Sequence, residues 1–451
     1  MATNYAYDNL SRLQSVLHQL AGSTIDGATY TVDNAGNRTA KTDQRAVVTS
    51  NYGYDAIYEL TGVTQGTNTT ESYTYDPVGN RLSSLGVSPY SVNVSNELNS
   101  TPTTSYIYDS NGNTLTSTTG SNTTTYTWDY ENRLTSGTLP GSGGTVSYRY
   151  DPFGRRIYKS SSSGTSIFAY DYDNLIEETN GVGAVVARYA QPQTVDEPLA
   201  MLRGGATSYY HGDGLGSVTS LSSSAGSLAQ TYGYDSFGKQ TSSSGSLTNP
   251  FQYTAREFDS EVSLYYYRAR YYDPSTGRFL SEDPFWIDIP DARISAYAYV
   301  SNEPTTVTDP LGLYGLSKKG NPPPVPPSPR LDKALRCLEG CYGKPLLITS
   351  TSEPIPQHKP GTPHRRGEAA DISYPASPAD RGNLLCCAAG CNFQFALDEG
   401  AHPSGPNVAP HIHVQFTPAR PGDVKPSWPN GVHGDLPKAG PTCACGTGAL
   451  P

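Results

Sequence analysis

The sequence predicts a mainly β protein in which a long repeat region is followed by a smaller α+β domain. Three observations support this prediction. An aromatic-x-aromatic-Asp motif recurs through the first 250 residues. Only 35% of the chain is hydrophobic, while Ser, Thr, Asn and Gly are abundant, which disfavours a compact helical protein. The composition changes near residue 313: 31 of the 34 tyrosines precede it, and all seven cysteines follow it.

The repeated unit predicts a β-hairpin. Aromatic residues at i and i+2 lie on one face of a strand, and a following Asp-x-x-Gly supplies a turn. One hairpin cannot bury its aromatic face alone, so successive hairpins are expected to stack into a continuous curled sheet. The copies are Tyr5–Asp8, Tyr52–Asp55, Tyr73–Asp76, Tyr106–Asp109, Tyr126–Asp129, Tyr148–Asp151, Tyr170–Asp173 and Tyr232–Asp235, with a degenerate copy at Tyr30–Asp33.

These copies resemble the YD repeats of Rhs proteins, and the segment from Leu264 to Pro284 resembles the Rhs core signature. The resemblance implies a spiralling β-sheet shell around a toxic C-terminal domain. The repeat sheet would then cover residues 1–250, and the core-associated region residues 251–313. About ten copies are fewer than a closed shell usually has, so a partial shell is expected.

The ten residues Pro304–Leu313 match the Rhs junction motif, Pro-x-x-x-x-Asp-Pro-x-Gly-Leu. The resemblance implies self-cleavage between Leu313 and Tyr314 by two aspartates that act like those of an aspartic protease. Asp309 is one of them, and Asp283 is the candidate partner, although Trp286 stands where the family has glycine. The alternative is that Asp-Pro-x-Gly is simply a β-turn.

Residues 314–330 form a proline-rich linker, and its Gly320–Pro329 stretch is expected to adopt polyproline II. The C-terminal domain, residues 331–451, follows. Short helices are expected at Leu331–Cys341 and Leu384–Cys391, each with cysteines on one face. Disulfides between these helices are the favoured interpretation, with structural zinc and free thiols as the alternatives.

Two short segments of this domain predict a metal site. His364 precedes Asp371 by seven residues, and His411 and His413 alternate along an expected strand, which places both on one face. A His/Asp/His set suits Zn²⁺ with an open position for water. The non-metal alternative is a set of unrelated loop and strand residues.

Together these segments resemble the zinc peptidases of the D-alanyl-D-alanine carboxypeptidase and hedgehog fold, with their HxxGxAxD and HxH motifs. The resemblance makes His364, Asp371 and His413 the zinc ligands and His411 a catalytic residue. Peptidoglycan peptide stems would be the substrate. Pro410 occupies the place of a glutamate base found in some members, and the arginine expected after the strand at 348–350 is absent.

The function expected from these resemblances is that of a polymorphic toxin, which self-releases a zinc peptidase. An immunity protein and secretion-system delivery proteins would be its partners, and its destination would be the cell exterior or a target-cell periplasm. No signal peptide or membrane-spanning run is visible. Residues 1–313 carry 18 basic against 31 acidic side chains, which disfavours nucleic acid as a partner.

Two other functions remain open. One is a cell-surface adhesion or interaction protein whose C-terminal domain binds zinc without catalysis. The other is a metal-dependent nuclease, which the missing basic patch disfavours.

Overall fold

The computed structural model describes residues 1–284 and 295–313, together with four short segments at 348–350, 369–373, 395–398 and 411–415. The chain divides into two units, Met1–Gly315 and Leu316–Pro451. Among the described residues, helical structure is limited to the 3₁₀ turns η1 (Tyr253–Ala255) and η3 (Val300–Asn302). Within the same residues, no helix has the length and apolar character needed to cross a membrane.

The repeats form two antiparallel sheets in which each strand pairs with its neighbours in sequence. The first sheet contains β1 (Ala2–Tyr7), β2 (Leu13–Leu20), β3 (Ser23–Val32), β4 (Arg38–Asp43), β5 (Val48–Tyr54), β6 (Leu60–Gln65), β7 (Asn68–Tyr75) and β8 (Arg81–Ser84). The predicted mainly β, stacked-hairpin architecture is therefore confirmed.

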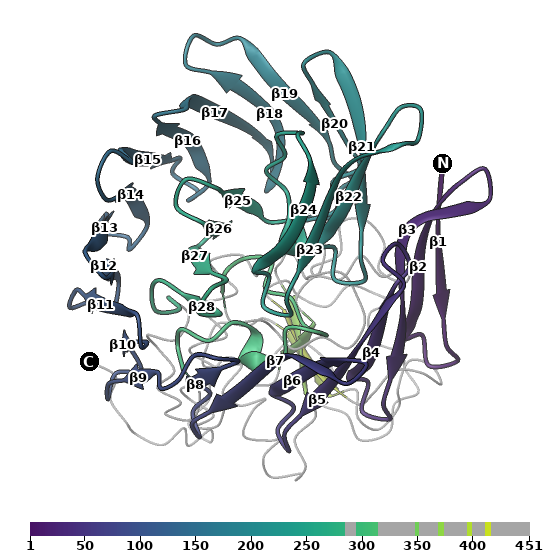
Figure 1. Cartoon of the computed structure of the whole chain (residues 1–451), viewed down its shortest axis with the longest axis horizontal. Helices are drawn as coiled ribbons and strands as arrows, with labels where there is room; N and C mark the ends of the chain where they lie inside the picture. Colours follow the sequence, from purple (N-terminus) through teal and green to yellow (C-terminus); the bar gives the residue numbers. More distant parts are fainter. Residues whose placement is uncertain (285–294, 314–347, 351–368, 374–394, 399–410, 416–451) are drawn as a thin grey trace. The chain divides into compact units, whose positions relative to one another are not determined.

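The second sheet has sixteen strands, and β9 to β19 follow one another along a curve in Figure 1. Its strands are β9 (Ser91–Val92), β10 (Leu98–Ser100), β11 (Thr104–Tyr108), β12 (Thr114–Thr119), β13 (Asn122–Trp128), β14 (Leu134–Thr138), β15 (Thr145–Tyr150), β16 (Arg156–Ser161), β17 (Gly164–Asp171), β18 (Asn174–Asn180), β19 (Val185–Ala190), β20 (Ala200–Arg203), β21 (Ala206–Gly212), β22 (Val218–Ser223), β23 (Leu228–Tyr234) and β24 (Gln240–Gly245).

The aspartate of each repeat closes the turn of its hairpin. Between β15 and β16, Asp151 Oδ1 accepts hydrogen bonds from the amides of Phe153 at 2.9 Å and Arg155 at 3.0 Å. Gly154 takes a φ of +81°, which glycine adopts without strain. The same double acceptance recurs at Asp8, Asp55, Asp76, Asp109, Asp129, Asp213 and Asp235.

The copy at Tyr170–Asp173 folds differently from its prediction. The hairpin of β17 and β18 closes two residues earlier, with Asp171 opposite Asn174, and Tyr172 is exposed. Asp173 is followed three residues later by Ile176 rather than glycine. The four-residue turn needs a residue of positive φ at that position, so it does not form here.

The second aromatic residue of each repeat ties its hairpin to the preceding one. Tyr150 Oη donates a hydrogen bond of 2.6 Å to the carbonyl of Leu134, the first residue of β14. In each case the acceptor is the residue that begins the returning strand of the preceding hairpin. The equivalent bonds run from Tyr54 to Arg38, Tyr75 to Leu60, Tyr108 to Leu98, Trp128 to Thr114 and Tyr234 to Val218. In the irregular copy Tyr170–Asp173 it is the first aromatic residue, Tyr170, that forms this bond, with the carbonyl of Arg156.

A third sheet lies inside the curve of the second one (Figure 1). It contains β25 (Glu257–Asp259), β26 (Leu264–Tyr267), β27 (Arg270–Asp273) and β28 (Arg278–Phe279). Alternation along β26 sends Tyr265 and Tyr267 into one core cluster and Leu264 and Tyr266 into another. Both faces of this inner sheet are therefore buried against the repeats.

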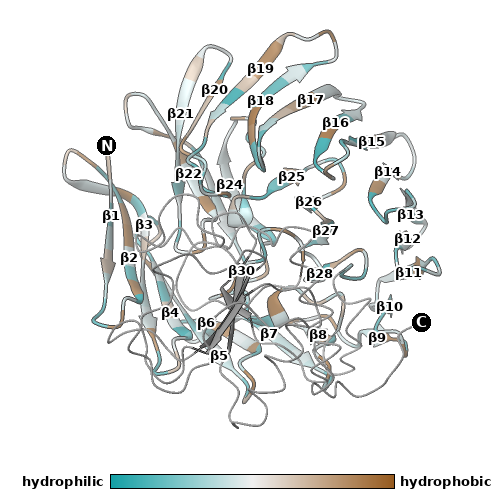
Figure 2. Cartoon of the chain, turned by 180° about the vertical axis from the view of Figure 1, so that it is seen from behind, coloured by the Kyte–Doolittle hydropathy of each residue, from teal (hydrophilic) through white to brown (hydrophobic). Residues whose placement is uncertain are grey.

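The core is built from tyrosine more than from aliphatic residues. Tyr265, Tyr267, Tyr272 and Tyr299 are each 0% exposed and pack in one cluster. Figure 2 accordingly shows strands that are mostly pale or hydrophilic, with brown restricted to short stretches. Aromatic rings bury large areas even though their hydropathy is moderate, which explains how a polar sequence forms a core.

Buried charges join the inner sheet to the repeats. Arg156 of β16 is 1% exposed and forms ion pairs with Glu257 and Asp259 of β25. Lys159 lies 3.1 Å from the same Asp259 carboxylate. Removing one partner would leave an uncompensated buried charge. This network therefore holds β25 against the second sheet, β9 to β24, which we call the repeat wall.

The first sheet contacts the last strands of the second sheet through polar side chains. The rings of His18 on β2 and His211 on β21 have centroids 4.7 Å apart. Asp26 of β3 accepts a hydrogen bond of 2.8 Å from Thr219 of β22, and Lys41 of β4 lies 2.6 Å from Asp213. This seam therefore depends on paired hydrogen-bonding groups.

The described residues of the C-terminal unit form a four-stranded antiparallel sheet, ordered β29 (Ile348–Ser350), β30 (Ala369–Ser373), β32 (His411–Gln415), β31 (Phe395–Asp398). The expected strands at residues 348–350 and 411–413 are confirmed. The linker at 314–330 and the cysteine-bearing segments at 331–341 and 384–391 lie outside the described residues.

Candidate functional site: a buried carboxylate pair at the junction

The junction segment runs along the turn between β26 and β27. The Ala269 amide donates a hydrogen bond of 3.1 Å to the carbonyl of Leu311. Gly312 has a φ of +66°, and a Cβ there would lie 2.1 Å from the carbonyl oxygen of Tyr267. Only glycine fits this position, because both the conformation and the close approach exclude a side chain. This packing explains why the junction motif has glycine at position 312.

Two carboxylates and one guanidinium meet beside this segment. Arg270 Nη2 lies 2.8 Å from Asp283 Oδ2 and 3.4 Å from Asp309 Oδ2. The two carboxylate oxygens are consequently within about 6 Å of each other, since both contact the same nitrogen. All three side chains are at most 3% exposed. The structure thus brings together Asp283 and Asp309, which are far apart in sequence.

Burial raises the pKa of Asp309 to about 7, because removal from water disfavours the charged carboxylate. Arg270 opposes this shift, and Asp283 adds to it. A carboxyl with this pKa retains its proton in much of the population near neutrality. It can therefore act as a proton donor where an ordinary aspartate cannot.

The carboxyl of Asp309 also contacts the proposed cleavage residue. Its Oδ1 accepts a hydrogen bond of 3.1 Å from the Leu313 amide. The carbonyl carbon of Leu313 is two covalent bonds from that nitrogen, or roughly 2.5 Å. Asp309 therefore lies within reach of this carbonyl, directly or through one water molecule.

Arg270 additionally holds the main chain around the carboxylates. Its Nε donates a hydrogen bond to the carbonyl of Gly312, and its Nη1 donates one of 3.0 Å to the carbonyl of Ala296. Its guanidinium carbon stands 3.6 Å from the ring centroid of Phe279. One side chain thus orients both carboxylates and the residue before Leu313.

Sequence reasoning did not identify Arg270. It ends the Tyr-Arg-Ala-Arg stretch of residues 267–270, within the segment that resembles the Rhs core signature, so its position was visible. The usable signal was physical: two buried carboxylates need a cation nearby, and Arg270 is the second arginine of that segment. Tyr314 and Trp286, which also figured in the prediction, lie outside the described residues.

The backbone register of the C-terminal sheet bears on the predicted metal site. Asp371 is directly opposite His413, and Ser373 is opposite His411. Positions directly opposite in an antiparallel pair occupy one face of the sheet. His364 lies outside the described residues. Among the side chains that the structure describes, no group of three or more His, Cys, Asp or Glu is arranged to hold a metal ion.

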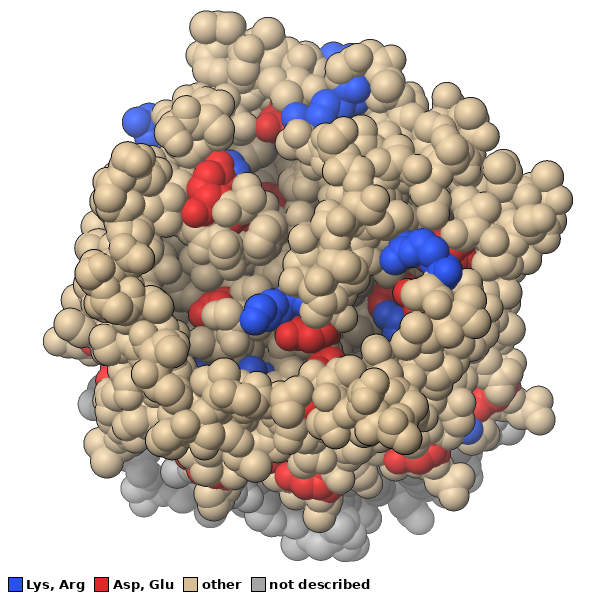
Figure 3. Space-filling view, viewed as in Figure 1, with Lys and Arg blue, Asp and Glu red and all other residues tan. Residues whose placement is uncertain are grey.

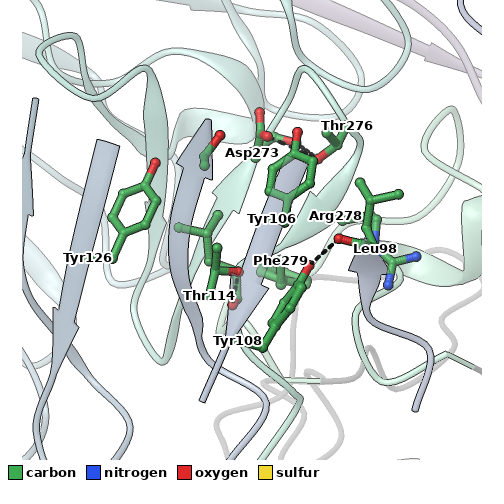
Figure 4. Close-up of a pocket in the computed structure, with 11 residues that line it drawn as sticks. Leu98, Tyr106, Tyr108, Thr114, Tyr126, Asp273, Thr276, Arg278 and Phe279 are labelled. Atoms are coloured by element: carbon green, nitrogen blue, oxygen red, sulfur yellow. Dashed lines mark hydrogen bonds between the residues drawn. The ribbon is translucent and has the colours of Figure 1, made fainter. Parts of the chain in front are cut away.

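A small cavity lies between the repeat wall and the inner sheet (Figure 4). Its volume is about 30 Å³, and its lining includes Tyr106, Tyr108 and Tyr126 from the wall and Asp273 and Arg278 from the inner sheet. This volume accommodates about one water molecule. The cavity is therefore a packing gap too small for an organic ligand.

Some charged residues lie inside a recess, while others lie on its rim and on the outer surface (Figure 3). Figure 3 shows a hollowed face on which acidic and basic side chains lie together inside the hollow. Opposite charges that lie close together in a recess are less screened by salt than charges on an open surface.

A family model described as Teneurin YD-shell matches residues 7–305. The chain belongs to the teneurin YD-shell family. The predicted YD-repeat identity is thereby confirmed for the repeat and core-associated regions of this YD-shell protein. The match ends before Leu313 and Tyr314, the predicted cleavage site, and does not extend into the C-terminal unit.

Relatives of this YD-shell protein include bacterial toxins. The tRNA3(Ser)-specific nuclease WapA of Bacillus spizizenii is 32% identical over 273 residues, 57% of this chain and 12% of the relative. Toxin protein Tse5 of Pseudomonas aeruginosa is 33% identical over 105 residues, 23% of this chain and 8% of the relative. The chain therefore spans about a tenth of the length of these curated relatives.

The YD-shell fold also matches solved structures. The crystal structure of TcdB2-TccC3-TEV aligns with a TM-score of 0.51 and 20% identity, covering 69% of this chain and 18% of that one. At this identity the similarity concerns the fold alone.

Proposed function

We propose that this chain belongs to a polymorphic toxin, in which the YD-shell cleaves its own chain between Leu313 and Tyr314. The observation that carries the proposal is the contact of Asp309 with both Arg270 and the Leu313 amide. Toxin relatives that share the YD-shell support the biological role.

The proposed reaction is hydrolysis by a carboxylate pair that shares one proton. Asp283, which lies 2.8 Å from the Arg270 cation, takes a proton from the attacking water. Asp309, with its raised pKa, supplies its proton to the carbonyl oxygen of Leu313. The water oxygen bonds to the carbonyl carbon, and the intermediate then breaks its bond to the Tyr314 nitrogen.

The released products follow from that last step. The amine of Tyr314 leaves with a proton from the pair, and Leu313 acquires a carboxylate. Arg270 contributes by holding the Gly312 carbonyl and by balancing charge, without itself exchanging a proton.

For the C-terminal unit we propose a zinc peptidase that acts on peptidoglycan peptide stems. Asp371 and His413 are paired in register, which is compatible with a shared ligand role, and His364 would be the third ligand. Zinc at such a site acidifies bound water and polarises a peptide carbonyl. His411 would act as the catalytic residue beside it.

The proposed peptidase requires proteins that deliver it to its substrate and a partner that protects the producing cell. The substrate lies in the periplasm or on the cell surface, so the protein would be secreted or delivered there by secretion-system proteins. A toxin of this kind also requires an immunity protein in the producing cell.

The experiment incubates the full chain with purified peptidoglycan, with and without a chelator, and follows released muropeptides. Release that the chelator abolishes, and that His413→Ala also abolishes, supports the peptidase. A protein that retains zinc but releases nothing favours a non-catalytic, zinc-binding interaction domain instead. Cleavage of RNA or DNA in a parallel reaction would point to a nuclease.

A further inference from the structure

Three consecutive carbonyls of the junction are held by three consecutive residues of the inner sheet's turn. Arg268 Nη1 donates to the carbonyl of Pro310. The Ala269 amide donates to Leu311 and Arg270 Nε to Gly312. Arg270 belongs to the carboxylate cluster, whereas Arg268 does not contact either aspartate. Its role therefore needs a separate explanation.

Arg268 is fixed by the repeat wall. Its two terminal nitrogens form a bidentate pair of hydrogen bonds with the Asp196 carboxylate, with Nη2 2.8 Å from Oδ1 and Nη1 3.1 Å from Oδ2. Nη2 also donates a hydrogen bond of 3.3 Å to the carbonyl of Asp173, in the turn between β17 and β18. The side chains of Arg268 and Asp196 are each 13% exposed. Bidentate geometry of this kind fixes direction as well as distance.

Asp196 belongs to a connection that interrupts the regular hairpins. Residues 191–199 join β19 to β20, and Asp196 adopts a φ of +64° within them. Asn174 ties this connection to β18 through bonds of 3.0 Å to the Pro192 carbonyl and 3.3 Å to the Thr194 carbonyl. The position of Asp196 thus depends on the folding of β17 to β20.

We infer that the Arg268–Asp196 pair is a clasp that couples cleavage at the junction to the folded state of the repeat wall. This inference rests on the proposed function, because it concerns the rate of the same self-cleavage. Arg268 is a positioning residue: it fixes the Pro310 carbonyl, one residue from Asp309, only while Asp196 is in place. Premature cleavage before the wall has formed is thereby suppressed.

A purely structural role would be the simpler explanation for a buried ion pair, and such pairs often add little stability. Arg268 Nη1 donates hydrogen bonds both to Asp196 and to the carbonyl of Pro310. Because the same atom binds the repeat wall and the junction, the position of the junction is coupled to that of the wall.

The test compares the rates of self-cleavage of Arg268→Ala, Asp196→Asn and the double variant after synthesis of the full chain. Each single change should slow cleavage about 10- to 100-fold, because misplacement by about 1 Å has effects of that size. Asp196 also pairs with Arg256, and Arg268 also binds the carbonyls of Asp173 and Pro310, so the two single changes overlap only in the Arg268–Asp196 contact. The double variant should therefore be slowed by less than the product of the two single effects. The pH profile should keep its midpoint, because neither residue is part of the carboxylate cluster.

Arg203→Ala is the matched control. Arg203 forms an ion pair with Glu178 on the same wall, and its side chain is 19% exposed. The Arg203→Ala variant should cleave itself at the wild-type rate. Wild-type rates in both Arg268→Ala and Asp196→Asn would overturn the inference, as would equal slowing in Arg203→Ala.

A second measurement does not depend on cleavage. In the Asp309→Asn background, hydrogen exchange of the peptide covering residues 304–313 should accelerate at least tenfold with Arg268→Ala and with Asp196→Asn, but not with Arg203→Ala. Unchanged exchange overturns the clasp. If the wild-type chain does not cleave but exchange still accelerates in the Arg268→Ala and Asp196→Asn variants, the clasp between these residues is supported and the proposed self-cleavage is rejected.

Discussion

The Leu313 amide donates a hydrogen bond of 3.1 Å to Asp309 Oδ1, so the last residue of the junction motif is anchored by the aspartate four residues earlier. The other oxygen of the same carboxyl faces Arg270 at 3.4 Å. One oxygen of Asp309 therefore stabilises the turn that ends at Leu313, and its carboxyl also lies within reach of the Leu313 carbonyl. The turn-only and catalytic explanations of the motif differ in what they predict for pH and substitution.

Self-cleavage should slow as the pH rises through about 7. Burial raises the pKa of Asp309 to about 7, and above that pH the carboxyl loses the proton that it would donate. The cleavage rate of the full chain, measured from pH 5 to pH 9, should fall about tenfold per pH unit on the alkaline side. A rate independent of pH between 6 and 9 would exclude Asp309 as the acid.

Gly312→Ala should block cleavage. Its Cβ would lie 2.1 Å from the Tyr267 carbonyl oxygen, which forces the main chain at Leu313 to move. Gly154→Ala is the matched control, because Gly154 also has a positive φ, of +81°, but no atom lies within 4 Å of its Cβ. The control should cost about 1 kcal/mol of stability and cleave normally. Equal cleavage by both variants would contradict the tight packing of the junction.

The bond between neighbouring hairpins should have a measurable effect on stability. Tyr150→Phe removes the donor to the Leu134 carbonyl and should lower the free energy of unfolding by about 1 kcal/mol. Tyr130→Phe removes a hydroxyl from a residue that is 89% exposed and should change nothing. Chemical denaturation of both variants checks this, and equal midpoints would show that the repeated bond contributes no stability.

The seam between the two repeat sheets should weaken in acid. Burial lowers the pKa of His211 from 6.5 to about 4, with His18 adding to the shift and Asp26 opposing it. Between pH 6.5 and pH 4 the unfolded chain therefore binds more protons, and the stability decreases as the pH falls. Thermal unfolding at pH 7 and pH 5 should show a smaller decrease for His211→Gln than for wild type. An equal decrease in both would mean that this histidine is not responsible.

The hairpins were predictable because each is specified within a few residues: an aromatic pair, an aspartate and a residue of positive φ, most often glycine. The copy at Tyr170–Asp173 failed for a local reason: the β-branched Ile176, which disfavours a positive φ, stands where the other turns have glycine or Ser11, Tyr58 and Asn132. The bonds from Tyr150 and its equivalents to the preceding hairpin could not be predicted, because they depend on how hairpins stack. Asp213 likewise forms a repeat-type turn although it follows His211 and Gly212 rather than two aromatic residues.

The candidate site was predictable only in part. Asp283 and Asp309 were found from the resemblance to the junction motif, and the structure places both on Arg270. Arg270 was missed because its significance lies in contacts with residues 13 and 39 positions away, which no local pattern reveals. The zinc ligands remain a prediction, with Asp371 and His413 paired in register and His364 outside the described residues.

The most direct test of the account is the mass and the N-terminal sequence of the fragments from the purified full chain, beside Asp309→Asn and a control, Asp129→Asn. Asp129 closes a repeat turn with the same kind of bonds but lies in the hairpin between β13 and β14. We predict that wild type and Asp129→Asn divide into residues 1–313 and a fragment beginning at Tyr314, while Asp309→Asn stays intact. An uncut wild type, a different new N-terminus, or unchanged cleavage in Asp309→Asn would contradict the proposed self-cleavage.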